Sequence, residues 1–153
     1  MGLGFKTFAV GEVLGAADVN GYLMRQTIPA FSSSAAIIAG ITSPETGQHA
    51  VARDTGKLWY YDGTAWRPTW QSGIQLVSFS SKTKHSLVVN FPTAFGAAPS
   101  MCVNIATGAG ATEMWVARIT EISATNFTIF VFSTNGSTGT WTNIEVEWLA
   151  FRK

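Results

Sequence analysis

The sequence predicts a mainly β protein, in which a short helix and a small β-meander precede a C-terminal six-stranded antiparallel β-sandwich. Along most of residues 73–153, apolar and polar side chains alternate, which is typical of half-buried strands. Between residues 30 and 70, glycine-containing turns separate short runs rich in aromatic residues. Helical patterns are confined to two short stretches that precede these turns.

The first helical pattern covers Ala16–Gln26. Four of its side chains follow the i, i+3, i+4, i+7 spacing of one helix face, namely Val19, Tyr22, Leu23 and Gln26. Asp18 suits the positive end of the helix dipole, whereas Gly21 weakens the helix. A helix this short needs a surface to pack on. A second short helix is expected at residues 35–39, capped by the serines at 32–34 and ended by Gly40.

A three-stranded meander is expected next, with strands at His49–Arg53, Lys57–Tyr61 and Ala65–Thr69. The connecting tripeptides, Asp54-Thr55-Gly56 and Asp62-Gly63-Thr64, suit the left-handed backbone of tight hairpins. The segment contains five large aromatic residues, Trp59, Tyr60, Tyr61, Trp66 and Trp70. Because so small a meander cannot bury all of them, they are expected to pack against the helices, a neighbouring subunit or a partner protein.

Six strands are expected in the third segment, at Ile74–Ser80, Ser86–Phe91, Ser100–Thr107, Glu113–Ile122, Asn126–Ser133 and Thr142–Phe151. In the last strand, Ile144, Val146, Trp148 and Ala150 share one face, and Glu145 and Glu147 share the other. The strand that begins at Asn126 is apolar on both faces. Since a two-layer sandwich buries one face of each strand, the second apolar face predicts a subunit interface. Residues 108–111 and 135–139 are expected to be loops.

The composition favours a self-assembling protein. Of the 153 residues, 12% are charged and 46% are hydrophobic, so partner subunits are expected to cover part of the apolar surface. The formal net charge is +1 and the basic residues are scattered, which argues against nucleic-acid binding. No apolar run is long enough to insert into a membrane, and the N-terminus does not resemble a signal peptide. The single cysteine, Cys102, is expected to be a small buried residue.

Two groups of residues are candidates for specific roles. Arg118 lies inside an apolar strand, where its charge needs a carboxylate partner. A structural ion pair with Glu147 or Glu145 is therefore expected, either within one subunit or between subunits. The alternative is a contact between Arg118 and a ligand. Trp141 is expected in a loop at one end of the sandwich, where it could stack on a sugar ring or on a partner, with ordinary packing as the alternative. Trp115 could serve similarly or face the core.

No catalytic or metal-binding pattern is present in the sequence. Glu145 and Glu147 lie roughly 7 Å apart by the two-residue strand repeat, a pairing that glycosidases also use, but no other residue marks an active cleft. His49 and His85 stand far apart without further ligands. The sequence therefore predicts a protein that is not an enzyme and that holds no metal and no cofactor.

The N-terminal half contains a characteristic set of short stretches: Lys6-Thr7-Phe8, Gly11-Glu12-Val13-Leu14, Ala16-Ala17-Asp18-Val19-Asn20, Tyr22-Leu23-Met24 and the hairpin 54–66. In these stretches residues 6–69 resemble the N-terminal region of small tail or fibre proteins of phages that infect actinobacteria. The resemblance implies an attachment or connector module of a virion.

Five stretches of the C-terminal segment stand in a characteristic order: Val89-Asn90-Phe91 with Phe95 and Pro99, Met101–Ile105, Val116–Ile119, Ile122–Phe127 and Val146–Ala150. In these stretches residues 73–153 resemble the H-type lectin domain, which implies a six-stranded sandwich that forms trimers. In that family a Trp-His pair and an Arg hold the sugar. In this sequence the Trp-His pair falls at about Thr134-Asn135 and the Arg at about Met114. Neither the aromatic-imidazole pair nor the guanidinium group is therefore retained.

The sequence is therefore interpreted as a phage virion structural protein, made in the host cytoplasm. Residues 1–72 are expected to dock it to other virion proteins, and residues 73–153 to form a homotrimeric sandwich. As a tail-fibre or baseplate component, it would contribute to recognition of host-surface glycan, with Trp141, Asn135, Thr134 and Trp115 as candidate ligand contacts. The alternative is a capsid decoration or fibre-stabilising protein that binds no ligand.

Overall fold

The computed structural model describes residues 9–23, 27–106 and 112–153 and divides the chain into two compact units, Met1–Arg67 and Pro68–Lys153. The division falls five residues before the expected one, which lay between residues 72 and 73. The reason is that β5 (Trp70–Lys82) begins earlier than expected. From its first residue it pairs with the last strand of the chain, beginning at Phe151↔Trp70. Each unit is described by itself.

The first unit contains a four-stranded sheet in the order β1-β2-β3-β4. Its strands are β1 (Ala30–Phe31), β2 (His49–Ala52), β3 (Lys57–Tyr61) and β4 (Trp66–Pro68). The expected three-stranded meander is therefore confirmed as β2-β3-β4. Strand β1, which was not expected, adds to it in parallel: Val51 N–H donates to the carbonyl of Pro29, and Arg53 N–H to that of Phe31, both at 2.9 Å.

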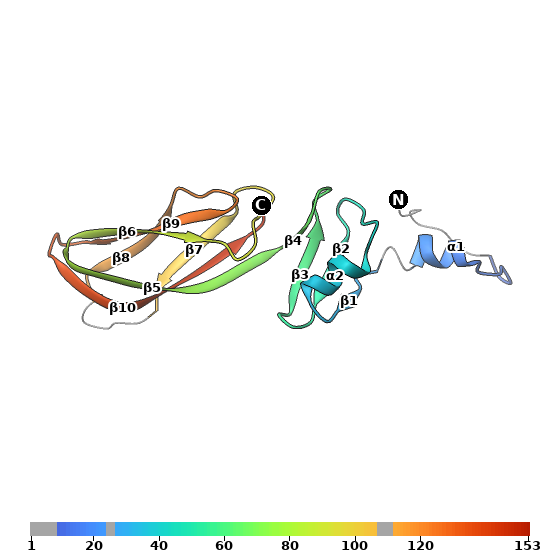
Figure 1. Ribbon diagram of the computed structural model, residues 1–153, viewed down its shortest axis with the longest axis horizontal. Helices are drawn as coiled ribbons and strands as arrows, with labels where there is room; N and C mark the ends of the chain where they lie inside the picture. The colour runs from blue at the N-terminus through green and yellow to red at the C-terminus, as the bar shows by residue number, and fades with distance from the viewer. Residues whose placement is uncertain (1–8, 24–26, 107–111) are drawn as a thin grey trace. The chain divides into compact units, whose positions relative to one another are not determined.

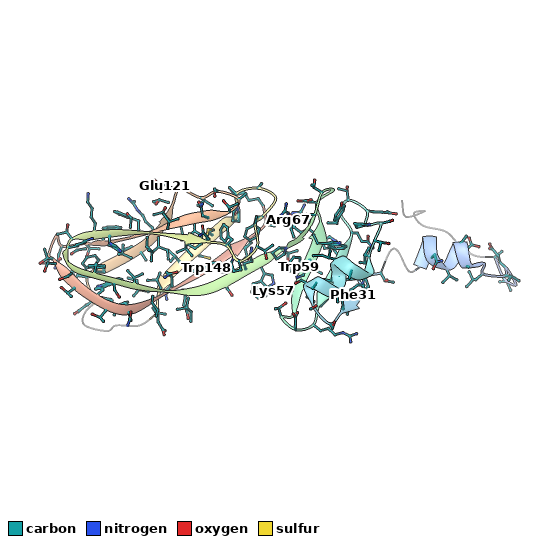
Figure 2. All side chains as sticks on the ribbon, in the orientation of Figure 1. Phe31, Lys57, Trp59, Arg67, Glu121 and Trp148 are labelled. Atoms are coloured by element: carbon teal, nitrogen blue, oxygen red, sulfur yellow. The ribbon has the colours of Figure 1, made fainter. Side chains whose placement is uncertain are left out.

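Helix α2 (Ser34–Gly40) supplies the apolar cover that this sheet needs. Ser33 caps it, its hydroxyl accepting a hydrogen bond from Ala36 N–H at 3.2 Å, as the serine run predicted. Ile37 of α2 is fully buried in one cluster with Ala50, Ala52, Trp59 and Trp66, and Phe31 packs against it; Phe31 and Trp59 are labelled in Figure 2. Two of the five aromatic residues thus pack beside a helix, as expected.

The N-terminal helical pattern forms less regular helix than expected. α1 covers only Ala16–Asp18, and a π-helical turn follows at Val19–Leu23. Met24–Gln26, the last part of the expected helix, lie outside the described residues. Before α1, the side chains of Val10, Val13 and Leu14 are exposed.

The second unit is a mainly β, two-layer structure, which confirms the expected fold class (Figure 1). One sheet has the order β5-β10-β7, with β10 at Gly139–Phe151 and β7 at Ser100–Ile105. The other has the order β6-β9-β8, with β6 at Lys84–Asn90, β9 at Asn126–Ser133 and β8 at Trp115–Thr120. All four pairings are antiparallel, so six strands form two three-stranded layers.

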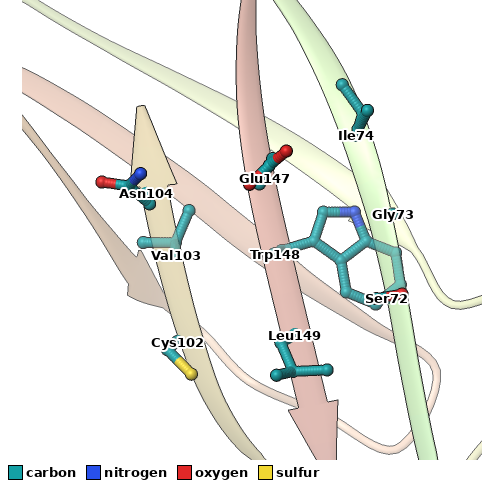
Figure 3. A pocket seen from close by; sticks show the side chains of 9 residues that line it. All are labelled: Ser72, Gly73, Ile74, Cys102, Val103, Asn104, Glu147, Trp148 and Leu149. Carbon is teal, nitrogen blue, oxygen red and sulfur yellow. The ribbon is translucent and has the colours of Figure 1, made fainter. Parts of the chain in front are cut away.

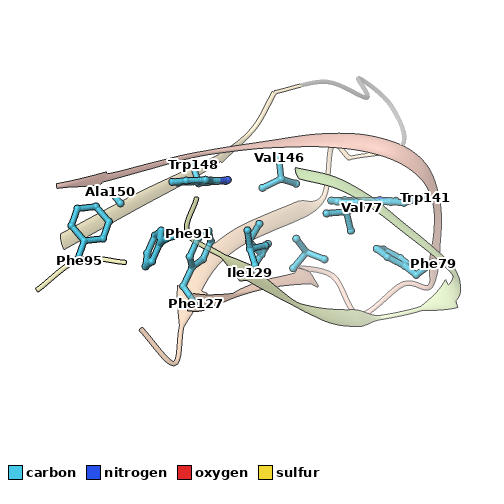
Figure 4. Packing of buried hydrophobic residues seen from close by; sticks show 12 residues of the cluster. Val77, Phe79, Phe91, Phe95, Phe127, Ile129, Trp141, Val146, Trp148 and Ala150 are labelled. Carbon is cyan, nitrogen blue, oxygen red and sulfur yellow. The ribbon is translucent and has the colours of Figure 1, made fainter. Parts of the chain in front are cut away.

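A single hydrophobic core lies between the two sheets (Figure 4). Phe127, Ile129 and Val131 enter it from the central strand β9, and Val146, Trp148 and Ala150 enter it from the central strand β10. The Trp148 indole meets the rings of Phe91 and Phe127 edge-on, with centroids at 5.8 and 5.2 Å. Such contacts add to the burial of apolar area, so the aromatic pairs fix how the sheets stack. The expected alternation in the last strand is confirmed, with Glu147 pointing outward.

Candidate functional site

Trp141 is buried in strand β10, so the loop position expected for it is wrong, and of the two roles left open it has the packing role. Its side chain is only 2% exposed, and its ring stacks on Phe79 at 5.1 Å. The reason is that β10 begins at Gly139, three residues earlier than expected, and carries Trp141 into the core opposite Phe79. The indole is therefore not available to a sugar or a partner.

Trp115 packs at the edge of the same core. Its ring lies 5.2 Å from both Phe79 and Trp141, and its indole passes over Gly139, where a Cβ would lie 2.7 Å from Cζ2. Of the two roles left open for Trp115, the structure places it in the packing role, although part of its surface remains accessible.

The loop after β9 brings together the positions that the lectin resemblance marked. The Thr134 backbone N–H and side-chain hydroxyl both donate to the carbonyl of Met114, at 2.7 and 2.9 Å. The Asn135 side-chain oxygen accepts from the Ser133 hydroxyl at 2.7 Å and from Ser137 N–H at 3.0 Å. The Thr134 and Asn135 side chains are exposed, and the Thr134 hydroxyl and the Asn135 carbonyl oxygen form hydrogen bonds within this loop and to Met114.

The outer face of β6-β9-β8 combines aromatic side chains with positive charge. We call it the cationic face and define it by Lys84, Val88, Val116, Arg118, Phe130 and Phe132. The rings of Phe130 and Phe132 stack with their centroids 5.6 Å apart. The guanidinium carbon of Arg118 lies 5.0 Å from the Phe130 centroid and 5.4 Å from the Phe132 centroid. A groove of about 390 Å³ runs between these residues and Gly136 of the loop. Val88 and Val116 are 61% and 43% exposed.

The outer face of β5-β10-β7 combines aliphatic side chains with negative charge. We call it the acidic face and define it by Ile74, Leu76, Glu145, Glu147, Leu149 and Phe151. Glu147 is flanked by Asn104 on β7 and by Ile74 on β5, as Figure 3 shows, within a hollow of about 590 Å³. Ile74 and Leu76 are 58% and 50% exposed. Cys102 also lies exposed here, which corrects the expectation that it is buried.

The expected ion pair between Arg118 and Glu147 does not form within one chain. Arg118 belongs to the cationic face and Glu147 to the acidic face, and the core lies between the sheets that carry them. Arg118 is also not enclosed in apolar surroundings as expected: it is exposed and held over two rings. Neither side chain has an ion-pair partner among residues 9–23, 27–106 and 112–153.

Two further features concern possible cofactors and membranes. Within the described part of the chain, no group of three or more His, Cys, Asp or Glu side chains is placed to hold a metal ion. Among the same residues, no helix has the length and apolar character that crossing a membrane requires.

Part of the cationic face was predicted from the sequence. The strand 126–133, apolar on both faces, predicted a second exposed face, and Phe130 and Phe132 lie on it. Arg118 was also singled out, although for an ion pair, whereas Lys84 was missed because it lies on a different strand, β6.

Comparison with known proteins gives little. No family model and no curated protein matches the chain. Among solved structures, an N-truncated R1-type pyocin tail fibre is similar, with 14% identity, a TM-score of 0.39, and coverage of 77% of this chain and 94% of that one.

Proposed function

We propose that this chain is a structural component of a phage virion, of the tail-fibre or baseplate type, whose sandwich is a non-catalytic device for homotrimeric assembly. The observation that carries the assembly role is that both outer faces of one small sandwich expose large apolar side chains, Val88 at 61% and Ile74 at 58% among them. Exposed apolar surface of this kind marks interaction sites in soluble proteins.

The virion assignment rests on the resemblance of residues 6–69 to phage tail and fibre proteins. The exposed Val10, Val13 and Leu14 support a docking role for the N-terminal segment, because an apolar segment without internal cover gains free energy by binding a partner. The partners are other virion proteins, and the protein acts in the assembled particle.

Reconstruction of the phage particle tests this proposal. The expected density shows three copies of the sandwich around one axis on the tail or baseplate, with the N-terminal segments against another virion protein. Absence of the chain from purified particles, measured by mass spectrometry, would overturn the virion assignment.

Binding of host-surface glycan is the second candidate function. It is supported by the groove that contains Arg118, Phe132 and Gly136. Aromatic and guanidinium groups suit the apolar faces and hydroxyls of sugars. Sites of this kind are individually weak, and several on one particle would raise avidity.

Titration of the purified chain with host cell-wall polysaccharide tests this second function. We expect sites with dissociation constants on the order of 1 mM, weakened by Phe132→Ala and unchanged by Val88→Ala, which lies on the same face outside the groove. Binding that is undetectable at millimolar site concentrations would leave assembly as the function of this face.

A further inference from the structure

We propose that copies of the sandwich associate head to tail, with the cationic face of one copy packed on the acidic face of the next and Arg118 of one copy paired with Glu147 of its neighbour. This inference rests on the proposed self-assembly and specifies which surfaces carry it.

The charges of the cationic face are both positive and lie on either side of its central strand. Lys84 is opposite Phe132 on β6, and Arg118 is opposite Phe130 on β8. Two acids flank β8 along the chain, Glu113 before it and Glu121 after it, and the Glu121 carboxylate accepts a hydrogen bond from Thr128 at 2.8 Å. The part of the face around Phe130 and Phe132 is therefore positively charged.

The charges of the acidic face are both negative and lie on its central strand. Glu145 is opposite Leu76, and Glu147 is opposite Ile74 and Asn104. The outward side chains that flank Glu145–Phe151 on β5 and β7 are all described, and they include no Lys or Arg. Glu147 thus presents a negative charge to whatever covers this face.

The apolar side chains of the two faces complement each other as well. Each face places exposed aliphatic residues beside its charges, Val88 and Val116 on one and Ile74 and Leu76 on the other. Arginine and aromatic residues are enriched in the cores of protein interfaces, and Phe130, Phe132 and Arg118 form such a cluster. A second copy would bury these side chains and, in the same contact, supply the ion-pair partner that Arg118 and Glu147 lack among the described residues.

Pairing of like faces is disfavoured by the same charges. Two cationic faces would place Arg118 and Lys84 of both copies in one interface, and two acidic faces would bring their carboxylates together. Head-to-tail contact avoids both arrangements and uses both sides of every copy. Such heterologous contact closes into a ring if the rotation between copies allows it, and otherwise extends into a stack.

Charge reversal tests the pairing. The full chain is prepared with Arg118→Glu, with Glu147→Arg, and with both changes, and self-association is measured by analytical ultracentrifugation. Each single reversal is expected to weaken association by at least about tenfold. The double variant, in which the pair is restored with its signs exchanged, is expected to return to within about threefold of the wild type.

Mixing the two single variants is the sharper measurement. A chain with Arg118→Glu carries acidic groups on both faces, and a chain with Glu147→Arg carries basic groups on both. Each variant is therefore expected to associate weakly with its own copies and strongly with the other variant. The mixture is expected to form mixed complexes that contain both chains and that neither variant forms alone. The double variant alone forms the same oligomer as the wild type.

Two charge reversals away from these faces are the controls. Arg53→Glu and Asp54→Arg, both in the turn after β2 of the first unit, change the net charge by the same amounts at exposed positions. They are expected to leave self-association unchanged. Circular dichroism of every variant shows whether it is folded.

Four results would overturn the inference. One is that the Arg118→Glu variant dissociates while the Glu147→Arg variant associates like the wild type. That result would mean that the cationic faces of two copies contact each other. Another is a double variant no better than the single ones. The third is an oligomer unaffected by either reversal, which refutes the pairing but leaves the proposed assembly intact. A wild-type chain that stays monomeric refutes both.

Discussion

Gly73 of β5 lies opposite Trp148 of β10, and the Trp148 indole occupies the space that a side chain at Gly73 would need. A Cβ at Gly73 would lie 2.7 Å from Cζ2 and 2.8 Å from Cε2 of the ring. The indole is 5% exposed and packs against Phe91 and Phe127, so it cannot move aside without disturbing the core. The glycine therefore sets how closely β5 and the core aromatic rings approach.

Replacing Gly73 by alanine is expected to destabilise the sandwich. Overpacking of a well-filled core costs about 1–3 kcal/mol, which outweighs the gain of about 0.4–1 kcal/mol from lower entropy of the unfolded chain. Urea unfolding followed by tryptophan fluorescence measures the change. Gly15→Ala is the control, because a Cβ there makes only ordinary contact at 3.7 Å. A Gly73→Ala variant as stable as wild type would refute the close approach.

Trp141→Ala is expected to lower the free energy of unfolding of the sandwich by about 3–5 kcal/mol, since it empties a core position. Trp141→Phe should cost much less. It keeps a ring against Phe79 and removes the indole N–H, which is buried with no hydrogen-bond partner in the described part of the chain. Denaturant unfolding of both variants checks this. An alanine variant within about 1 kcal/mol of wild type would show that Trp141 is not a core residue.

His85 is expected to make the sandwich less stable in mild acid. Burial beside Phe79, with a smaller effect of Lys82, lowers the pKa of His85 below its ordinary value. The folded state thus favours the neutral ring. Its contribution to stability is present above the ordinary pKa of about 6.5 and is lost as the pH falls from there toward the lowered value.

Thermal unfolding of wild type and His85→Phe between about pH 7 and about pH 5 measures this contribution. The phenylalanine variant keeps an aromatic ring and cannot titrate, so its midpoint is expected to fall less with acid than that of the wild type. Equal slopes for the two proteins would contradict the role given to His85.

Asp62 is expected to stabilise the β3–β4 hairpin of the first unit. Its carboxylate accepts from Ala65 N–H at 2.7 Å, Thr64 N–H at 2.8 Å and Arg67 Nε at 3.0 Å. The bond from Ala65 N–H is the main cause that holds the pKa of Asp62 below its ordinary value, partly opposed by burial. The stabilisation is therefore present above about pH 4 and is lost as the pH falls through the lowered pKa.

Asp62→Ala should increase amide hydrogen exchange across residues 57–67, by a local loss of about 1–3 kcal/mol at neutral pH. Exchange in the sandwich should be unchanged, which gives an internal control. If residues 57–67 remain as protected as in the wild type, the three hydrogen bonds do not hold the hairpin.

Most strands could be predicted from the sequence, because β2, β3 and β6–β9 carry clear turns or regular alternation. Strand β1 could not, since Ala30–Phe31 is too short to show a period and forms only by pairing with β2. The start of β10 was missed for a different reason. Its pairing with β5 shifts between Trp141 and Ile144, and Asn143 adopts a φ of 53°, so the two-residue alternation is broken where Trp141 turns inward.

The candidate site was predicted only in part. Alternation assigned Arg118 and Glu147 to the faces of their own strands, but it could not say that these faces would lie on opposite sides of one core. That relationship depends on which strands pair, through the orders β5-β10-β7 and β6-β9-β8. The same topology gathers Lys84 and Arg118 around Phe130 and Phe132 from segments more than thirty residues apart in sequence.

The central claim is that the outer faces of the sandwich hold copies of this chain together. Light scattering coupled to size-exclusion chromatography tests it most directly. The account predicts a mass three times that of one 16.4 kDa chain, falling toward the single-chain mass when Arg118 is changed to Glu. A wild-type mass of 16.4 kDa at every concentration measured would contradict it.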